Sequence, residues 1–168
     1  MLPSKFKNLN LFLDGVGYQG QIEEIEIPKL AIKTEEYVGG GMGGPVDLDM
    51  GLEKMVAMLT FGGFMEELAK RFGQAGVDGV PLRARGAYEN DQTLAVDSVE
   101  IVMRGRLSEL DIGTWKRQEN NNFKTALPLA YFKISLNDKV LIEIDMLNLK
   151  FVVDGVDRYE EMRNALGL

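Results

Sequence analysis

The stretch Leu129–Asp145 reads LAYFKISLNDKVLIEID and alternates apolar and polar side chains on both sides of Asn137-Asp138. Its apolar phase consists of Phe132, Ile134, Leu136, Val140, Ile142 and Ile144. Its opposite phase contains Lys133, Ser135, Glu143 and Asp145. Alternation with a period of two around a two-residue turn is typical of a β-hairpin with one buried face. The sequence therefore predicts an antiparallel hairpin whose second face meets water or a polar partner.

The same alternation recurs in residues 9–13, 25–32, 46–50 and 99–104. Pro28 interrupts the second of these stretches. Because proline cannot donate a ladder hydrogen bond, we predict an edge, a bulge or a corner between sheets there. The segment GFMEELAKRFG, residues 63–73, predicts a helix, since acids come first, bases come last and Gly73 follows as a cap. The tail is compatible with a second short helix that ends before Gly167. The pattern predicts one mainly β domain spanning residues 1–168.

Composition restricts the chemistry available to the chain. Its 168 residues include no Cys and no His, so the commonest general base and the commonest metal ligands are absent. We therefore expect no catalysis, no cofactor and no metal. The formal net charge of −7 disfavours general attraction to nucleic acid phosphates. No apolar run is long enough to predict a membrane span, and we expect a soluble protein that is made in the cytoplasm.

A glycine-rich stretch, EYVGGGMGGPVDLDMG (residues 36–51), contains the G-x-G-x-x-G spacing at Gly39, Gly41 and Gly44. A dinucleotide site requires a helix directly after the glycines, but here Pro45 and strand-like alternation follow. A nucleotide-binding module is therefore only an alternative. Glycine also permits positive backbone angles and the close approach of another chain, which we consider the better interpretation.

Three further features leave alternatives open. Asp47 and Asp49 lie two apart on a predicted strand and so share a face, which would suit a carboxylate-based hydrolase or a hard cation, although a solvated strand face is commoner. Methionines cluster around the glycine loop, where they would suit either core filling or a protein interface. Trp115 would suit a binding platform, although a single Trp more often anchors a core or a subunit contact.

Six segments, in the same order along the chain, resemble the major tail tube proteins of contractile-tailed bacteriophages and of the related R-type tailocins (pyocins). They are Asn10–Gly15, Ile27–Tyr37, Gly39–Met55, Val102–Lys116, Tyr131–Asp145 and Val153–Leu168. The resemblance implies two antiparallel sheets in a β-sandwich or half-barrel with one short flanking helix. It also implies that six copies form a ring whose inner strands close into one β-barrel, and that the rings stack into a tube.

The same resemblance implies a location and partners. The chain would be part of a virion tail or a tailocin particle assembled in the bacterial cytoplasm. Its partners would be other copies of itself, a tail sheath protein, a tape-measure protein, and baseplate and tail terminator proteins. DNA would pass through the channel as non-adhesive cargo in a phage, and ions in a tailocin. A type VI secretion tube protein is the alternative with the same architecture.

The resemblance further implies which residues mediate self-assembly. They are Gly39, Gly40, Gly41, Met42, Gly43, Gly44 and Pro45 in the glycine loop, the N-terminal residues 1–7, and Arg163, Leu166 and Leu168 near the C-terminus. Six copies at −7 each would carry −42 formal charges. We therefore predict that acidic side chains such as Glu100 and Glu143 face the channel and repel DNA.

Overall fold

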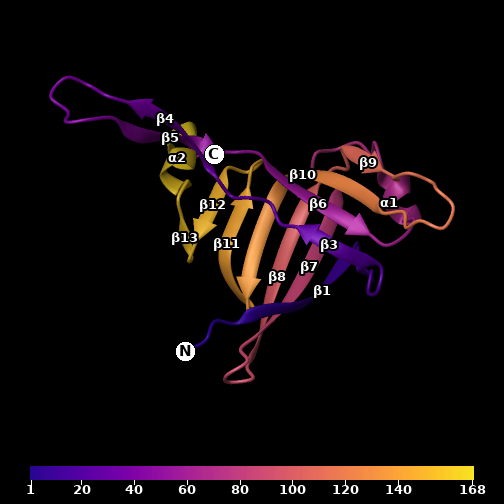
Figure 1. Ribbon diagram of the computed structural model, residues 1–168. Helices are drawn as coiled ribbons and strands as arrows, with labels where there is room; N and C mark the ends of the chain where they lie inside the picture. Colours follow the sequence, from indigo (N-terminus) through magenta and orange to yellow (C-terminus); the bar gives the residue numbers. More distant parts are fainter.

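The computed structural model describes residues 1–168 and contains thirteen β-strands and two short helices (Figure 1). The strands are β1 (Lys5–Leu13), β2 (Val16–Gly17), β3 (Ile22–Glu26), β4 (Ile32–Tyr37), β5 (Val46–Leu52), β6 (Met55–Phe61), β7 (Val80–Glu89), β8 (Val96–Gly105), β9 (Glu109–Asp111), β10 (Phe123–Leu136), β11 (Lys139–Asp145), β12 (Lys150–Val153) and β13 (Val156–Asp157). The helices are α1 (Glu66–Arg71) and α2 (Glu160–Leu166). Every strand pair is antiparallel, which confirms a mainly β fold. Neither helix has the length and apolar character that a membrane span requires.

The hairpin predicted from the sequence is formed by β10 and β11. Phe132 pairs with Ile144 and Ile134 pairs with Ile142, so the apolar phase of both strands shares one face. The turn residues Asn137 and Asp138 both have positive φ angles, of 46° and 68°. Two successive positive φ angles are the geometry of a two-residue hairpin turn that matches the twist of the strands. The predicted hairpin and its turn are confirmed.

Strand β10 is the longest and joins the two parts of the large sheet. Its first half pairs with β6 on one side and β9 on the other, and its second half pairs with β8 and β11. The main sheet then runs in the order β13-β12-β11-β10-β8-β7-β1-β2. Strands β3 and β6 cross over its inner face (Figure 1). The core fills the space between these layers and includes Leu11, Met55, Leu59, Phe61, Leu82, Met103, Leu127, Phe132 and Ile144.

Pro28 marks the corner between two sheets. Strand β3 ends at Glu26 and belongs to the eleven-stranded sheet, whereas β4 begins at Ile32 and pairs only with β5. This confirms the corner predicted from proline. It also corrects the expected arrangement of the sheets. The second hydrogen-bonded sheet is the two-stranded ribbon β4–β5, which projects away from the body, and the layer facing the main sheet belongs to the same large sheet through β10 (Figure 1).

The helices differ from the expectation of a single flanking helix, because there are two. In α1, Met65 and Leu68 are buried as the spacing predicted, and Gly73 has φ +77° just beyond the helix. Phe72 is exposed, because the backbone turns extended at that residue and takes its ring off the buried face. Helix α2 ends as the sequence indicated. Gly167 adopts the left-handed conformation that commonly terminates a helix.

Gly105 lies at the end of β8, where β10 changes partners. A Cβ atom there would lie 2.1 Å from the carbonyl oxygen of Pro128, which is a backbone atom that cannot move away alone. The register of β10 also shifts between Leu129 and Tyr131, opposite this point. Only glycine therefore allows the two strands to approach so closely.

We predict that Gly105→Ala lowers the free energy of unfolding by about 2 kcal/mol or more, because the added methyl group forces the β8 and β10 backbones apart. Urea unfolding of the unassembled chain measures this loss. The control is Gly63→Ala, since a Cβ at Gly63 meets no atom within 4 Å. Equal stabilities for the two variants would contradict the close approach.

Candidate functional site

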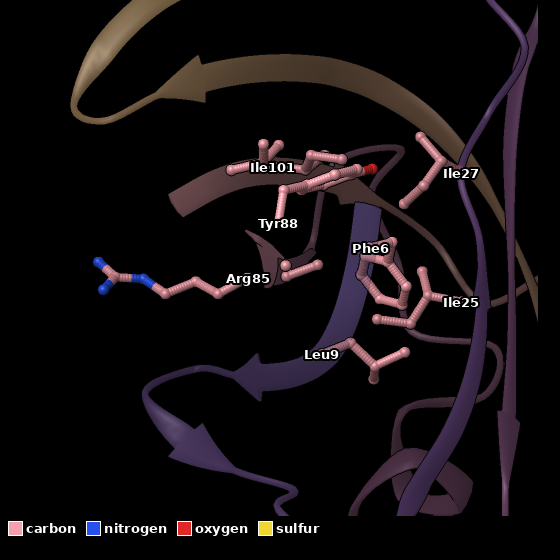
Figure 2. Close-up of a pocket in the computed structure, with 10 residues that line it drawn as sticks. Phe6, Leu9, Ile25, Ile27, Arg85, Tyr88 and Ile101 are labelled. Carbon is pink, nitrogen blue, oxygen red and sulfur yellow. The ribbon is translucent and has the colours of Figure 1, made fainter. Parts of the chain in front are cut away.

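The structure contains a small apolar cleft between the layers, but it lacks the groups of a catalytic site. The cleft has a volume of about 80 Å³ and is lined mainly by side chains of β1, β7 and β8 and of the segment around β3. Figure 2 shows Phe6, Leu9 and Ile25 converging on it, while the guanidinium group of Arg85 points away. No acid–base pair lines the cleft, so the arrangement suits packing rather than chemistry.

The structure contradicts both small-molecule alternatives. Gly44 is followed by strand β5 and not by a helix, so no helix N-terminus is available for a pyrophosphate. Asp47 and Asp49 lie on the exposed ribbon, and neither lines one of the larger cavities. No group of three or more acidic side chains is arranged to hold a metal ion. The nucleotide-binding and hydrolase interpretations are wrong.

The ribbon β4–β5 has two chemically different faces. Residues directly opposite in an antiparallel pair point to the same face. Thr34 pairs with Asp49 and Glu36 with Asp47, which makes one face polar and acidic. On the other face Tyr37 pairs with Val46, Leu48 pairs with Glu35, and Met50 follows at the next alternate position, so this face is mainly apolar and Glu35 is its acid. Between 46% and 55% of each of these four apolar residues is exposed.

The glycine loop, Gly39–Pro45, joins the two ribbon strands at the tip farthest from the body (Figure 1). Gly41 has φ +83°, which a side chain would disfavour. Met42 folds back over the loop: its N–H donates to the carbonyl of Gly39 at 3.3 Å, and its Sδ accepts the Gly39 N–H at 3.1 Å. The loop is therefore a short ordered turn with its backbone open to a neighbour.

The base of the ribbon is fixed to the body. A bulge lies between the pairs Ile32–Leu52 and Thr34–Asp49, and Gly51 within it has φ +104°. The Gly51 N–H donates to the Asp49 carboxylate at 2.7 Å. Leu52 packs against the core. The sequence correctly predicted the alternation in β5, but the expectation of a half-buried strand was wrong, because nothing in the chain covers its apolar face.

The outer face of the main sheet, defined here as the uncovered side of β1, β7, β8, β10, β11 and β12, carries paired charges. Arg85 forms a salt bridge with Glu100 at 2.7 Å, and Lys150 forms one with Glu143 at 2.5 Å. The guanidinium of Arg104 lies 4.1 Å from the ring centroid of Tyr131. That of Arg83 lies 5.0 Å from the ring of Phe12. Glu100 and Glu143 thus share one face, as predicted, but each is bound to a cation.

The opposite layer presents a more acidic surface. Across β3, β6, β10 and β9, one row of paired residues is Glu24, Thr60, Lys124 and Asp111, and the next is Glu26, Met58, Ala126 and Glu109. These rows alternate with core residues such as Ile25 and Leu59, so they point outward. We call this surface the acidic face. None of its four carboxylates forms a salt bridge.

The two ends of the main sheet differ. At one end, β1 is covered by β2 only at Phe12 and Leu13. Further along β1, the N–H groups of Leu9 and Leu11 donate to the side-chain oxygens of Asn8 and Asn10, both at 2.8 Å. At the other end, β12 is covered by β13, which is only two residues long. The sheet is therefore open, with unlike edges.

The predicted C-terminal assembly residues lie near the ribbon (Figure 1). Leu166 and Leu168 are exposed. Arg163 instead binds its own chain, because its guanidinium donates to the carbonyl of Leu149 at 2.8 Å and to Asp157 at 2.6 Å. The N-terminal segment lies elsewhere, and Leu2 is held by the buried side chain of Asn90.

Trp115 is not a core residue, since 83% of it is exposed. It projects from the loop between β9 and β10, beside Lys116, which forms a salt bridge with Glu119. The interpretation of Trp115 as a core anchor is wrong. The possibility of a subunit contact remains a prediction.

Comparison with known proteins shows which family the chain belongs to. Residues 3–167 match the family model described as "Phage tail tube protein FII". The chain belongs to the phage tail tube protein FII family. It is 39% identical to the tail tube protein of Escherichia phage P2, over 99% of both chains. It is 37% identical to the major tail tube protein of Serratia phage KSP20, over 99% of this chain and 98% of that protein.

Solved structures share the fold at low sequence identity. A sheath/tube terminator of an extracellular contractile injection system (PVC) superimposes with a TM-score of 0.61, at 10% identity, over 80% of this chain and 98% of its own. A chain of the PVC sheath-tube complex gives a TM-score of 0.57, at 10% identity, over 76% of this chain and 87% of its own. A chain of an anti-feeding prophage baseplate gives a TM-score of 0.54, at 8% identity, over 77% of this chain and 92% of its own.

Membership of this family confirms several expectations. The chain is a tail tube protein, a structural component of a phage tail, and not an enzyme. The family description also favours the phage group over the type VI alternative. The sequence alone did not indicate the aromatic–arginine pairs of the outer face, because their members lie on different strands. Only the pairing register brings them together.

Helix α2 gives a prediction about pH. The hydrogen bond from Arg163 lowers the pKa of Asp157, and the Tyr159 N–H bond adds to this effect. A carboxyl group whose pKa is lower in the folded state stabilises the fold above its unfolded pKa, near 4, and loses that contribution as the pH falls through the folded value. We expect Asp157→Asn to lower the Tm by a few degrees at neutral pH, and the difference from the unmodified chain to shrink as the pH falls below about 4 and to vanish below the folded pKa of Asp157.

Thermal unfolding measured across this pH range tests the prediction. The matched control is Asp154→Asn, because Asp154 lies 3.8 Å from Lys139 and both side chains are exposed. Its Tm should stay close to that of the unmodified chain at every pH. A Tm difference for Asp157→Asn that does not change with pH would contradict the role of the ion pair.

Proposed function

We propose that this tail tube protein forms six-membered rings in which the main sheets of neighbouring copies join edge to edge. The observation that carries the proposal is the open sheet with two unlike ends, β1 at one and β12–β13 at the other. When two different edges of identical copies pair, the contact is head-to-tail, and a suitable rotation closes it into a ring. Closure satisfies the edge groups of every copy and produces one continuous barrel.

The two layers then take different positions in the ring. The outer face of the main sheet is the proposed channel wall, because no element of the chain covers it and the core lies behind it. Glu100 and Glu143 would face the channel in this arrangement. The acidic face would lie on the outside of the tube, where its unpaired carboxylates suit a basic partner such as a tail sheath protein.

The ribbon would mediate contacts between copies in stacked rings. It projects from the body, its apolar face is unpartnered, and the glycine loop Gly39–Pro45 forms its tip. The small residues of the loop would allow the backbone of a neighbour to approach closely. Leu166 and Leu168 lie at the same end of the molecule and would extend this contact, while Arg163 would hold α2 in place.

The proposed tube also implies a domain organisation, a cargo and a set of partners. We infer that residues 1–168 act as one tube domain, which is supported by a single core cluster and by a family match over residues 3–167. The tube would conduct a phage genome through its channel, with a tape-measure protein inside before ejection. Terminator, sheath and baseplate proteins are the expected partners at its surface and ends, since the structural relatives come from such assemblies.

Negative-stain electron microscopy of the purified chain tests the proposed function. We expect rings with six-fold symmetry, and stacks of rings as the protein concentration rises. A monomer at every concentration, or rings of another symmetry, would contradict the proposal.

The ribbon gives a further prediction. Replacing Leu48 and Met50 together by Gln should prevent stacking, because burial of apolar surface between copies drives association. The fold should be retained, since both side chains are exposed and such substitutions change stability by only about 0.5 kcal/mol. Sedimentation velocity measures the loss of stacked species.

The control carries substitutions on the opposite face of the same ribbon. Glu36→Gln together with Asp47→Asn changes the pair of residues next to Leu48, on the polar face. This control should stack like the unmodified chain. If it stacks as poorly as the Leu48 and Met50 variant, the apolar face is not the contact.

A further inference from the structure

We propose that the channel wall avoids adhesion to DNA by pairing its charges within the sheet, and not by an excess of acid. The inference rests on the proposed function, which assigns the outer face of the main sheet to the channel. The charges on that face are unexpected for a chain of net charge −7. Its cations are Lys5, Arg83, Arg85, Arg104, Lys133 and Lys150, and its acids are Glu89, Glu100, Glu143 and Asp145. Repulsion by a net negative charge therefore cannot operate on this face.

Two of the cations are held by carboxylates. Arg85 and Glu100 are directly opposite on β7 and β8, and both Nε and an Nη atom of Arg85 lie within 2.9 Å of the same carboxylate oxygen. Lys150 reaches Glu143 diagonally from β12 to β11. This hydrogen bond raises the pKa of Lys150, so its ammonium group stays charged and bound. The carboxylates of both pairs are mostly shielded, with 23% and 19% of their side chains exposed.

Two more cations lie against aromatic rings. Arg104 and Tyr131 are directly opposite on β8 and β10, and Arg83 and Phe12 are directly opposite on β7 and β1. A guanidinium that lies over a ring gains electrostatic attraction from the ring face and keeps its plane against the sheet. Lys133 and Lys5 form no salt bridge, but they stand directly opposite Glu143 and Glu89 in the strand register. Every cation of the face thus has an acidic or aromatic residue beside it that competes with an incoming phosphate.

This pairing has a consequence for a polyanion in the channel. A free Arg or Lys gains affinity for DNA when it contacts a phosphate, because condensed counterions are released. A cation that is already paired must first give up its partner. Loss of Glu100 and Glu143 should therefore release Arg85, Lys133 and Lys150 as phosphate contacts. Duplex DNA is the partner that this face is arranged not to hold.

The test measures binding of the unassembled chain to a fluorescent DNA duplex of about 20 base pairs, by anisotropy between about 50 and 200 mM salt. The unmodified chain should bind only weakly, with a shallow salt dependence. The variant Glu100→Gln/Glu143→Gln should bind at least about 10-fold more tightly at the lowest salt, and the slope of log K against log salt should steepen by about 1 for each cation released. Adding Arg85→Gln, Lys133→Gln and Lys150→Gln to this variant should abolish the gain.

The matched control is Glu24→Gln/Glu26→Gln on the acidic face, which removes the same two charges from carboxylates that have no salt bridge. It should bind DNA no better than the unmodified chain. Equal gains in both double variants would show that only net charge matters and would overturn the inference, as would no gain in the first. Micrographs of the same variants, taken at the protein concentrations at which the unmodified chain is expected to assemble, separate the two claims. Rings without a gain in DNA affinity overturn the pairing alone, whereas an absence of rings overturns the proposed function.

Discussion

An antiparallel sheet that does not close on itself leaves backbone N–H and C=O groups unpaired along its outer strands, and the rest of this structure depends on that constraint. The main sheet ends at β1 and β2 on one side and at β12 and β13 on the other. Along β1, Asn8 and Asn10 satisfy the amides of Leu9 and Leu11 locally. Side-chain caps of this kind can be replaced by a strand without disturbing the core, so the edge is protected in one copy and usable between copies.

The side chains of the ribbon and of the two charged faces also form surfaces that suit contact with other molecules. An isolated chain leaves the apolar face of β4–β5 in water, which is unfavourable unless another surface covers it. The charges are divided between the layers: the acidic face has carboxylates without salt bridges, whereas on the outer face of the main sheet four cations are held by carboxylates or aromatic rings. One chain thus presents one surface suited to binding a charged partner and another suited to letting a charged cargo pass.

Much of the fold could be predicted from the sequence, because local signals specify it. The Asn137-Asp138 turn, the corner at Pro28 and the helix cap at Gly167 each depend on residues adjacent in the chain. The functional surfaces were harder to predict from the sequence, because they depend on the pairing register between strands. Alternation in Val46, Leu48 and Met50 showed that one strand face is apolar, but could not show that nothing covers it. Glu100 and Glu143 were chosen for their charge alone, and their cations lie on other strands.

Amide hydrogen exchange along β1 tests the central claim, edge-to-edge pairing of sheets between copies, most directly. The measurement compares the amides of residues 5–10 in the unassembled chain and in assembled particles. Pairing with the β12–β13 edge of a neighbour predicts slow exchange at alternate residues of this segment only after assembly. Particles that form while these amides exchange as fast as in the free chain would show that the copies associate without sharing strands, which would contradict the account.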